Sequence, residues 1–301
     1  MPDIDGARAV AVEPRFEDGY IASLKKRIER KERATSTPSV SQNTRSENAD
    51  KVIEVRDVQR RFGDFYAVKG ISFDVGPGEV FGLLGANGAG KSTTFRMLCG
   101  LLPASAGALR VAGMDLRHAA AAARARIGYM SQKFSLYGNL SVHQNLLFFS
   151  SAYGLKRGQR AKRLEWAQEQ FQLTGFADAT SSELPLGYKQ RLALACALMH
   201  EPEILFLDEP TSGVDPVARR EFWGHINAFA QSGVTVLVTT HFMEEAEYCD
   251  RLAIMAAGEI LALGAPTEIK AGAKSAEHPK PTMEDAFISL IERHDAGNGL
   301  T

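Results

Sequence analysis

The pattern of apolar and polar positions changes character near residue 50. Residues 51–58 (KVIEVRDV) alternate as a half-buried strand does, and residues 71–75 (ISFDV) repeat that signal. Uninterrupted apolar runs then predict four buried strands, at residues 78–85, 203–209, 234–241 and 250–258. Helical periods separate them, including residues 143–155 and 160–173. Buried strands that alternate with helices predict a largely parallel α/β sheet, with residues 133–190 as a smaller helical lobe.

The first 50 residues differ from the rest of the chain. Residues 25–33 (KKRIERKER) form a charge run and residues 34–50 are small and polar, which is the composition of a flexible linker. Residues 13–24 (EPRFEDGYIASL) resemble residues 280–291 (KPTMEDAFISLI) and share Pro, Glu, Asp and Ile with them. Two interpretations stay open. These are two unrelated short helices, or residues 1–24 are the tail of a preceding copy of the domain.

Composition narrows the class of protein. The chain has 301 residues, of which 45% are hydrophobic and 24% charged, as in ordinary globular proteins. A net charge of −1 gives no whole-chain argument for binding nucleic acid or an anionic membrane. The sequence has no run of 18 apolar residues and no secretory pattern at its start, so we expect a cytosolic location. Cys99, Cys196 and Cys249 are far apart and are expected to be buried thiols.

The motif GANGAGKS, at residues 85–92, fits the P-loop pattern G-x-x-x-x-G-K-[ST]. It follows the strand at residues 78–85 and precedes a helix expected over residues 93–102, which is the context a P-loop requires. Backbone N–H groups would surround phosphate oxygens, Lys91 would reach the β- and γ-phosphates, and Ser92 would bind Mg²⁺. The residues expected to hold ATP here are Gly85, Ala86, Asn87, Gly88, Ala89, Gly90, Lys91, Ser92 and Thr93.

Polar residues at the ends of three other strands complete a candidate site. Asp208 and Glu209 end the strand EILFLDE, where Asp208 would hold Mg²⁺ through water and Glu209 would polarise an attacking water. His241 ends VTVLVTTH, beside the Asp208 strand, and is expected to contact the γ-phosphate. Gln132 stands where a strand gives way to the helical lobe, and its amide would coordinate Mg²⁺ or hold the water. The other histidines are expected to be structural: His118, His143, His200, His225, His278 and His294.

The order of these motifs, with LPLGYKQ and SGVD between them, resembles the nucleotide-binding subunit of ATP-binding cassette (ABC) transporters over residues 52–264. The resemblance implies a P-loop NTPase fold with a RecA-like core sheet, an antiparallel β subdomain and a helical subdomain. It implies an ATPase domain over residues 51–272, followed by a C-terminal helix and tail at residues 273–301. The stretches KFSLYGNLSVHQNL and TTHFMEEAEYCDRLAIM resemble ABC-2 type bacterial multidrug exporters, which often fuse two cassettes in tandem.

The same resemblance assigns roles residue by residue. Phe62 would stack on adenine, with Phe65 and Tyr66 as nearby competitors. Gln132 would be the Q-loop residue and His241 the switch histidine. Asp215, in SGVDP, would be the D-loop aspartate. In this family two cassettes close head to tail, so each nucleotide lies between one P-loop and the signature loop of the partner cassette.

That signature loop departs from the usual L-S-G-G-Q, because Leu184, Pro185, Leu186, Gly187 and Tyr188 occupy its places. Pro185 has neither a hydroxyl nor an N–H, and Leu186 adds bulk where the backbone must come close. Gly187 is retained, and the helix expected over residues 188–199 still directs its N–H groups outward. A lost hydrogen bond to phosphate would cost about 1.5–3 kcal/mol. Either turnover is slowed, or another donor replaces the serine and the loop is fully active.

The resemblance implies an ATP-binding and ATP-hydrolysing subunit, peripheral on the cytoplasmic face of the membrane. It would power an ABC-2 type exporter through a separate permease, contacted by the helical lobe near residues 133–147. The expected partners are that permease and a second cassette, with no nucleic acid. One alternative is a soluble cassette ATPase acting on ribosomes or DNA, although only about 50 residues separate Gln132 from the signature and leave no room for a coiled-coil arm. Another is a nucleotide-binding regulator with little turnover, which Glu209 and His241 argue against and Pro185 and Leu186 favour.

Overall fold

The computed structural model describes residues 51–132, 136–274 and 279–297. The expected tail at residues 1–24 and the linker at residues 25–50 lie outside this range. Two sheets organise the described part, with strand orders β2-β1-β4-β5 and β10-β9-β3-β8-β7-β6. Their bounds are β1 (Ile53–Phe62), β2 (Phe65–Val75), β3 (Val80–Leu84), β4 (Ala106–Val111), β5 (Met114–Asp115), β6 (Ile127–Met130), β7 (Ile204–Asp208), β8 (Thr235–Thr240), β9 (Arg251–Ala256) and β10 (Glu259–Gly264).

The six-stranded sheet confirms the predicted parallel arrangement. Its strands β6, β7, β8, β3 and β9 pair in parallel, and only β10 is antiparallel to its neighbour. Leu84 pairs with Thr240, and Asp208 pairs with Thr239. The carboxyl ends of β3, β7 and β8 therefore meet at one edge, which is where open α/β sheets bind ligands.

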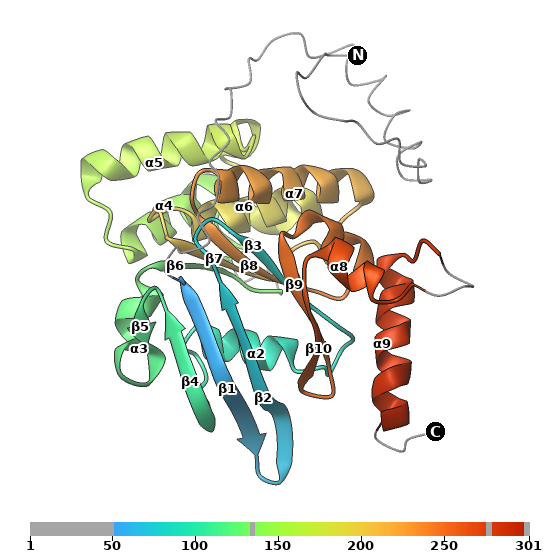
Figure 1. Cartoon of the computed structure of the whole chain (residues 1–301). Coiled ribbons are helices and arrows are strands. Elements are labelled where there is room, and N and C mark those ends of the chain that lie inside the picture. Colours follow the sequence, from blue (N-terminus) through green and yellow to red (C-terminus); the bar gives the residue numbers. More distant parts are fainter. Residues whose placement is uncertain (1–50, 133–135, 275–278, 298–301) are drawn as a thin grey trace. The chain divides into compact units, whose positions relative to one another are not determined.

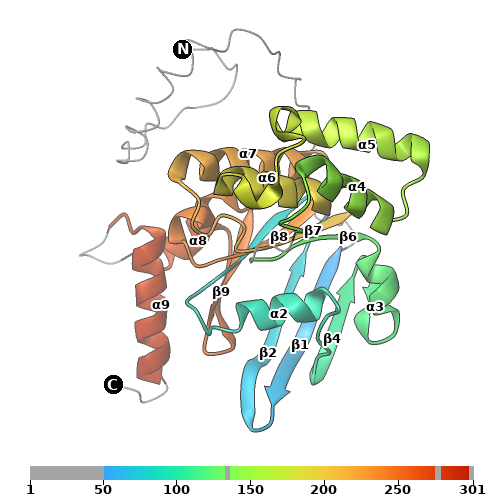
Figure 2. The same cartoon turned by 180° about the vertical axis from the view of Figure 1, so that it is seen from behind.

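Helices cover both faces of this sheet, as Figures 1 and 2 show from opposite sides. Along β7, Ile204 and Phe206 pack toward α2 and the antiparallel sheet, while Leu205 and Leu207 pack toward the helices of the other face. This alternation is the period of two expected of a strand buried on both sides. The helices are α2 (Lys91–Leu98), α3 (Leu116–Arg124), α4 (Val142–Ala152), α5 (Arg157–Gln170), α6 (Leu186–Ala197), α7 (Pro216–Gln231), α8 (Pro266–Ala271) and α9 (Met283–Gly297), with short 3-10 turns η1 (Thr174–Phe176), η2 (Ser181–Glu183) and η3 (Met243–Tyr248).

The helix after the P-loop and the signature helix differ from their predicted limits. The helix expected over residues 93–102 begins at Lys91 and ends at Leu98, because Gly100 adopts a left-handed conformation with φ of +64° and closes the last turn. The signature helix begins at Leu186, two residues earlier than expected, and ends at Ala197. Its N-cap is Pro185, whose φ of −54° is already suited to entering a helix.

A third apolar cluster lies at the β9 end of the sheet. Ile269 of α8, Met283 and Ala286 of α9, and Ala246 of η3 pack there against Leu252 and neighbouring strand residues. The three cysteines are free and buried, as predicted. Among the described residues, no helix combines the length and the hydrophobicity needed to cross a lipid bilayer.

Candidate nucleotide-binding site

The P-loop joins the end of β3 to the first turn of α2. Gly85, Gly88 and Gly90 all have positive φ, and Gly90 is the left-handed N-cap of the helix. A Cβ on Gly90 would lie 2.7 Å from the carbonyl oxygen of Ala67 on β2, so glycine is required there by both conformation and space. This curved backbone leads into a helix N-terminus, the arrangement that binds phosphate groups.

Lys91 is buried at the base of this loop. Its ammonium donates hydrogen bonds to the carbonyl oxygens of Gly85 (2.7 Å) and Ala86 (3.0 Å). Burial lowers the pKa of Lys91, and the nearby carboxylates of Glu209 and Asp208 act in the opposite direction. Lys91 is therefore held within the loop by two backbone carbonyl oxygens, close to both carboxylates at the end of β7.

Asp208 points into the same edge of the sheet from β7. Its Oδ1 accepts a hydrogen bond of 2.6 Å from the hydroxyl of Thr239 on β8. Burial raises the pKa of Asp208, and the hydrogen bond from Thr239 offsets part of this effect. Sequence reasoning missed Thr239, although the signal was available: it stands two residues before His241 on the strand that neighbours β7.

Glu209 is held in a strained, left-handed conformation with φ of +46°. Its N–H donates to the carbonyl oxygen (3.1 Å) and the hydroxyl (3.0 Å) of Thr239. Its Oε2 accepts a 2.8 Å hydrogen bond from Nε2 of Gln132 and lies 3.1 Å from Nδ1 of His241. The structure thus brings together three predicted residues from three strand ends around one carboxylate oxygen.

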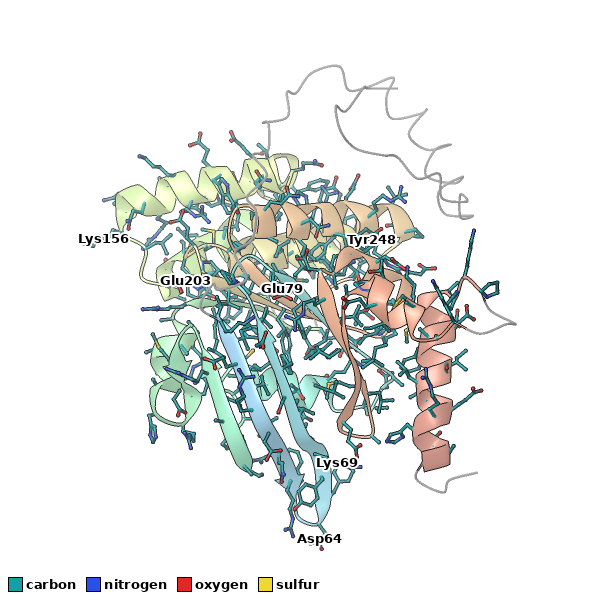
Figure 3. The ribbon with its side chains drawn as sticks, in the orientation of Figure 1. Asp64, Lys69, Glu79, Lys156, Glu203 and Tyr248 are labelled. Atoms are coloured by element: carbon teal, nitrogen blue, oxygen red, sulfur yellow. The ribbon has the colours of Figure 1, made fainter. Side chains whose placement is uncertain are left out.

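The residues expected near adenine lie at the turn between β1 and β2, which Figure 3 marks with Asp64. Phe62, Phe65 and Tyr66 are all exposed. Phe62 has a further partner, because the guanidinium of Arg60 lies 4.4 Å from its ring centroid. The turn end of this hairpin lies near the P-loop, since a Cβ on Gly90 would meet Ala67 of β2.

The signature residues lie at the N-terminus of α6. The carbonyl oxygen of Pro185 accepts hydrogen bonds from the backbone N–H groups of Tyr188 and Lys189, both 3.0 Å long. A Cβ on Gly187 would lie 3.2 Å from Cβ of Ala218 on α7, so the glycine lets the two helices approach closely. Leu186 is 40% exposed. Pro185 therefore starts the helix without disrupting it, and Leu186 presents an apolar side chain at its end.

Asp215 lies at the beginning of α7 and caps that helix. Its Oδ1 accepts hydrogen bonds from the N–H groups of Val217 (3.1 Å) and Ala218 (3.0 Å), and Pro216 occupies the first helical position. The loop that ends at Asp215 also lies against the signature, because a Cβ on Gly213 would be 3.4 Å from Cδ2 of Leu186.

Sequence reasoning also missed the support behind the P-loop. The N–H of Gly258, in the turn between β9 and β10, donates to the carbonyl oxygen of Ala89 (3.2 Å). The carbonyl oxygen of Gly258 in turn accepts from the N–H of Lys69 on β2 (2.8 Å). Gly258 thereby connects the P-loop to both sheets. This role could not be predicted from the sequence, because Gly258 is far along the chain from both Ala89 and Lys69.

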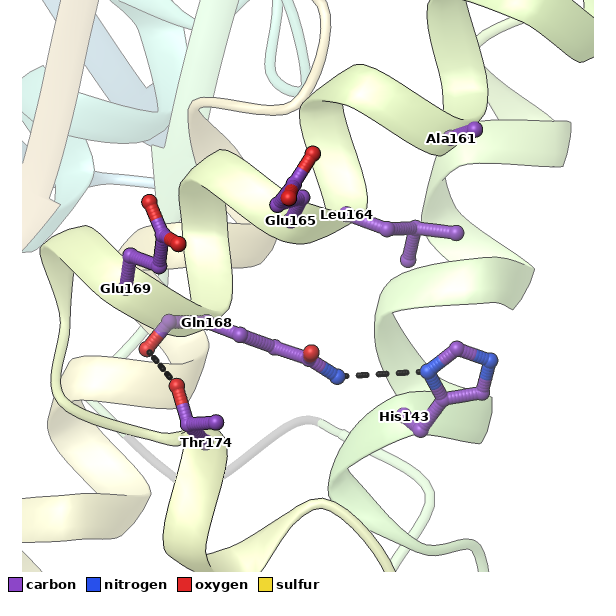
Figure 4. A pocket seen from close by; sticks show the side chains of 7 residues that line it. All are labelled: His143, Ala161, Leu164, Glu165, Gln168, Glu169 and Thr174. Carbon is purple, nitrogen blue, oxygen red and sulfur yellow. Dashed lines mark hydrogen bonds between the residues drawn. The ribbon is translucent and has the colours of Figure 1, made fainter.

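A separate pocket lies between α4 and α5, away from these residues (Figure 4). Gln168 and His143 are joined across it by a hydrogen bond of 3.2 Å. Glu165 and Glu169 line its side on α5. His143 therefore connects α4 to α5 through this hydrogen bond.

Comparison with known proteins places this geometry in a family. A family model described as ABC transporter matches residues 68–212. The chain is 52% identical over 284 residues to a probable multidrug ABC transporter ATP-binding protein, YbhF, of Escherichia coli, a match that covers 94% of this chain and 48% of that protein. The chain thus spans about half the length of this relative.

Two further comparisons cover most of both proteins. The Nod factor export ATP-binding protein I of Paraburkholderia xenovorans is 41% identical over 251 residues, covering 81% of this chain and 83% of that protein. A solved ATP-binding subunit of an ABC transporter superposes with a TM-score of 0.71 at 27% identity, covering 80% of this chain and 99% of that one. The fold is therefore the cassette fold that the sequence predicted. This chain belongs to the ATP-binding proteins of ABC transporters.

Proposed function

We propose that the chain binds ATP with Mg²⁺ and hydrolyses it to power an exporter built on a separate permease. The observation that carries this proposal is the meeting of Gln132, Glu209 and His241 around one carboxylate oxygen, at the sheet edge that also holds Lys91 and Asp208. Catalysis of phosphoryl transfer is mainly positioning and charge stabilisation, which such a cluster supplies.

Each group has a distinct task in this proposal. The P-loop N–H groups and Lys91 bind the phosphates, and His241 contacts the γ-phosphate. Glu209 accepts a proton from the attacking water and orients it. Ser92, Gln132 and Asp208 offer the oxygen ligands that Mg²⁺ prefers, with Asp208 acting through water. The metal ion would supply charge neutralisation between the β- and γ-phosphates.

We assign adenine stacking to Phe62, and Tyr66 is its competitor, since the guanidinium of Arg61 lies 5.6 Å from the Tyr66 ring centroid. Arg60 covers its ring, and the Nη1 group of Arg60 donates a 2.8 Å hydrogen bond to the carbonyl oxygen of Pro103, which fixes the guanidinium. A ring held in this way loses less side-chain entropy when a base stacks on it.

A second cassette would complete the site with its own α6 N-terminus. The N–H groups of Leu186 and Gly187 precede the first hydrogen bonds of the helix, which Tyr188 and Lys189 make to Pro185, so α6 provides a positive end for the γ-phosphate. Pro185 supplies no side-chain donor, so this contact would depend on the backbone of Leu186 and Gly187. The second cassette is another copy of this chain or a cassette of different sequence.

The membrane partner would dock on an aromatic surface of the helical lobe, made of Tyr137, Leu147, Phe148 and Tyr153. All four side chains are more than one third exposed. The ring centroids of Tyr137 and Phe148 are 4.6 Å apart, so these two exposed rings contact each other. Aromatic patches of this kind are enriched at protein interfaces. The segment expected to reach the permease, residues 133–147, includes residues 133–135, which lie outside the described range.

Export, rather than action on ribosomes or DNA, is supported by the names of the relatives. YbhF is named a probable multidrug ABC transporter ATP-binding protein, and the Paraburkholderia protein is named for Nod factor export. The ABC-2 class of the permease and the peripheral position on the cytoplasmic face of the membrane are parts of the proposal that rest on the sequence resemblance. Glu209 and His241, both placed at the sheet edge, favour turnover over a purely regulatory role.

Replacing Phe148 with alanine should weaken the association of the chain with its membrane partner. Truncation of an aromatic anchor at an interface costs about 1 kcal/mol or more, which corresponds to roughly fivefold weaker association. Cell fractionation should show a smaller membrane-bound share of Phe148→Ala, while the purified variant binds ATP as the wild type does. Leu263→Ala on β10 is the matched control, because Leu263 and Phe148 are both 42% exposed. Equal membrane binding by wild type, Phe148→Ala and Leu263→Ala would contradict docking at this surface.

A further inference from the structure

Glu245 is a buried carboxylate on η3 that contacts the loop after Glu209. Its side chain is 1% exposed. Its Oε1 accepts a hydrogen bond from the hydroxyl of Thr211, which is equally buried, and lies 3.6 Å from Nε of Arg219 on α7. Glu245 thus joins three segments that are far apart in the sequence.

Thr211 belongs to the loop that connects Glu209 to Asp215. Two turns shape this loop: the N–H of Ser212 donates to the carbonyl oxygen of Glu209 (3.2 Å), and the N–H of Val214 donates to that of Thr211 (3.1 Å). A hydroxyl fixed at Thr211 therefore restrains both ends of the loop. One end carries the proposed base and the other carries the D-loop aspartate.

Arg219 connects the same carboxylate to the segment after His241. Its guanidinium lies 4.5 Å from the ring centroid of Phe242, and the rings of Phe242 and His241 are 4.1 Å apart. Its Nη2 donates to the carbonyl oxygen of Val214 (3.5 Å), and Nη1 lies 3.9 Å from a carboxylate oxygen of Glu244. Arg219 therefore contacts the D-loop on one side and the switch segment on the other.

Such a buried arrangement is a poor source of stability. Removing two charges from water costs several kcal/mol per ion, and apolar residues of similar volume often stabilise a protein equally well or better. Here Nε of Arg219 and Oε2 of Glu245 also have no hydrogen-bond partner among the described residues. Unlike an apolar core, this cluster fixes the position of the loop from Glu209 to Asp215 relative to the segment after His241.

We propose that Glu245 is a positioning residue for hydrolysis: through Thr211 and Arg219 it sets the loop from Glu209 to Asp215 against the segment that follows His241. This inference rests on the proposed ATPase function. The cluster touches neither the P-loop nor the hairpin at Phe62, so it would act on the hydrolytic step and leave nucleotide binding unchanged.

The test compares Thr211→Val with Thr211→Ser in the full chain. Valine has nearly the shape of threonine and lacks the hydroxyl, whereas serine keeps it. Thr211→Val should lower kcat about tenfold, equivalent to about 1.4 kcal/mol, with KM for ATP within about twofold of wild type. Thr211→Ser should restore most of kcat. Glu247→Gln, which removes a carboxylate paired with Lys270 on the outer side of the same turn, is the control and should match wild type.

Two outcomes would overturn the inference, and they are distinguishable. If wild type hydrolyses ATP in a Glu209-dependent manner and Thr211→Val has the same kcat, the positioning role is wrong while the proposed function stands. If wild type has no Glu209-dependent hydrolysis, the proposed function fails and the positioning role fails with it. Glu245→Gln, which keeps an acceptor for Thr211 and removes the charge facing Arg219, should show the same selective loss of kcat.

Discussion

The Glu209→Gln variant should bind ATP as tightly as the wild-type chain and lose nearly all hydrolysis. Glutamine has the size of glutamate but cannot accept the proton of the attacking water. General base catalysis contributes about 100-fold to 10,000-fold, so we expect a loss of at least about 100-fold in kcat. Equilibrium binding of ATP with Mg²⁺ and single-turnover hydrolysis of the same samples would separate the two effects.

The geometry around Glu209 explains why one residue should matter this much. Its strained backbone is fixed by two hydrogen bonds to Thr239, and its carboxylate lies between Gln132 and His241. Glu203, at the opposite end of β7, has an exposed side chain paired with Arg126 and provides the matched control. Glu203→Gln should hydrolyse ATP at the wild-type rate. Equal rates for Glu209→Gln and Glu203→Gln would show that Glu209 is not the base.

The Gly90→Ala variant should lose ATP binding itself. Gly90 has φ of +101°, where a side chain is strained, and its Cβ would lie 2.7 Å from a backbone oxygen that cannot yield easily. The left-handed conformation alone costs about 1–2 kcal/mol, and the clash would displace the loop that cradles the phosphates. We expect the affinity for ATP to fall at least about tenfold, measured by titration calorimetry.

A variant of a second glycine distinguishes the effect of backbone strain from loss of the phosphate-binding loop. Gly113, in the turn between β4 and β5, has φ of +73°, and a Cβ added there would meet no described atom within 4 Å. Gly113→Ala should lower the free energy of unfolding by a similar strain cost while ATP affinity stays at the wild-type value. If Gly90→Ala bound ATP as well as Gly113→Ala does, the assignment of this loop to the phosphates would be wrong.

Much of the fold could be predicted because the relevant signals are local. The apolar runs that became β3, β7 and β8 are too long and too hydrophobic for exposed segments, and each ends in a residue of distinct chemistry. Parallel strands place their carboxyl ends at one edge of the sheet, so Asp208 and His241 could be predicted to lie near each other. The P-loop could be predicted from its sequence motif and from the strand and helix that flank it.

The remaining features depend on contacts between distant segments. Thr239 is buried inside an apolar strand, and its role follows only from its register with Asp208. Gly258 matters because a turn far along the chain reaches Ala89. Glu245 falls in a polar stretch, MEEAEY, that looks like a solvated surface, and its burial is decided by the packing of η3 against α7. The start of α6 was predicted two residues late because Gly187 has low helix propensity, whereas the helix already begins at Leu186.

The proposed ATPase site is completed by the signature of a second cassette. The most direct test is steady-state ATP hydrolysis by the purified chain over a wide range of protein concentration, with Glu209→Gln measured in parallel. If the second cassette is another copy of this chain, specific activity should rise with protein concentration, because two copies then close on each other, and it should be absent in the variant. A chain that binds ATP yet hydrolyses it no faster than Glu209→Gln at every concentration would contradict a working signature at Pro185–Tyr188.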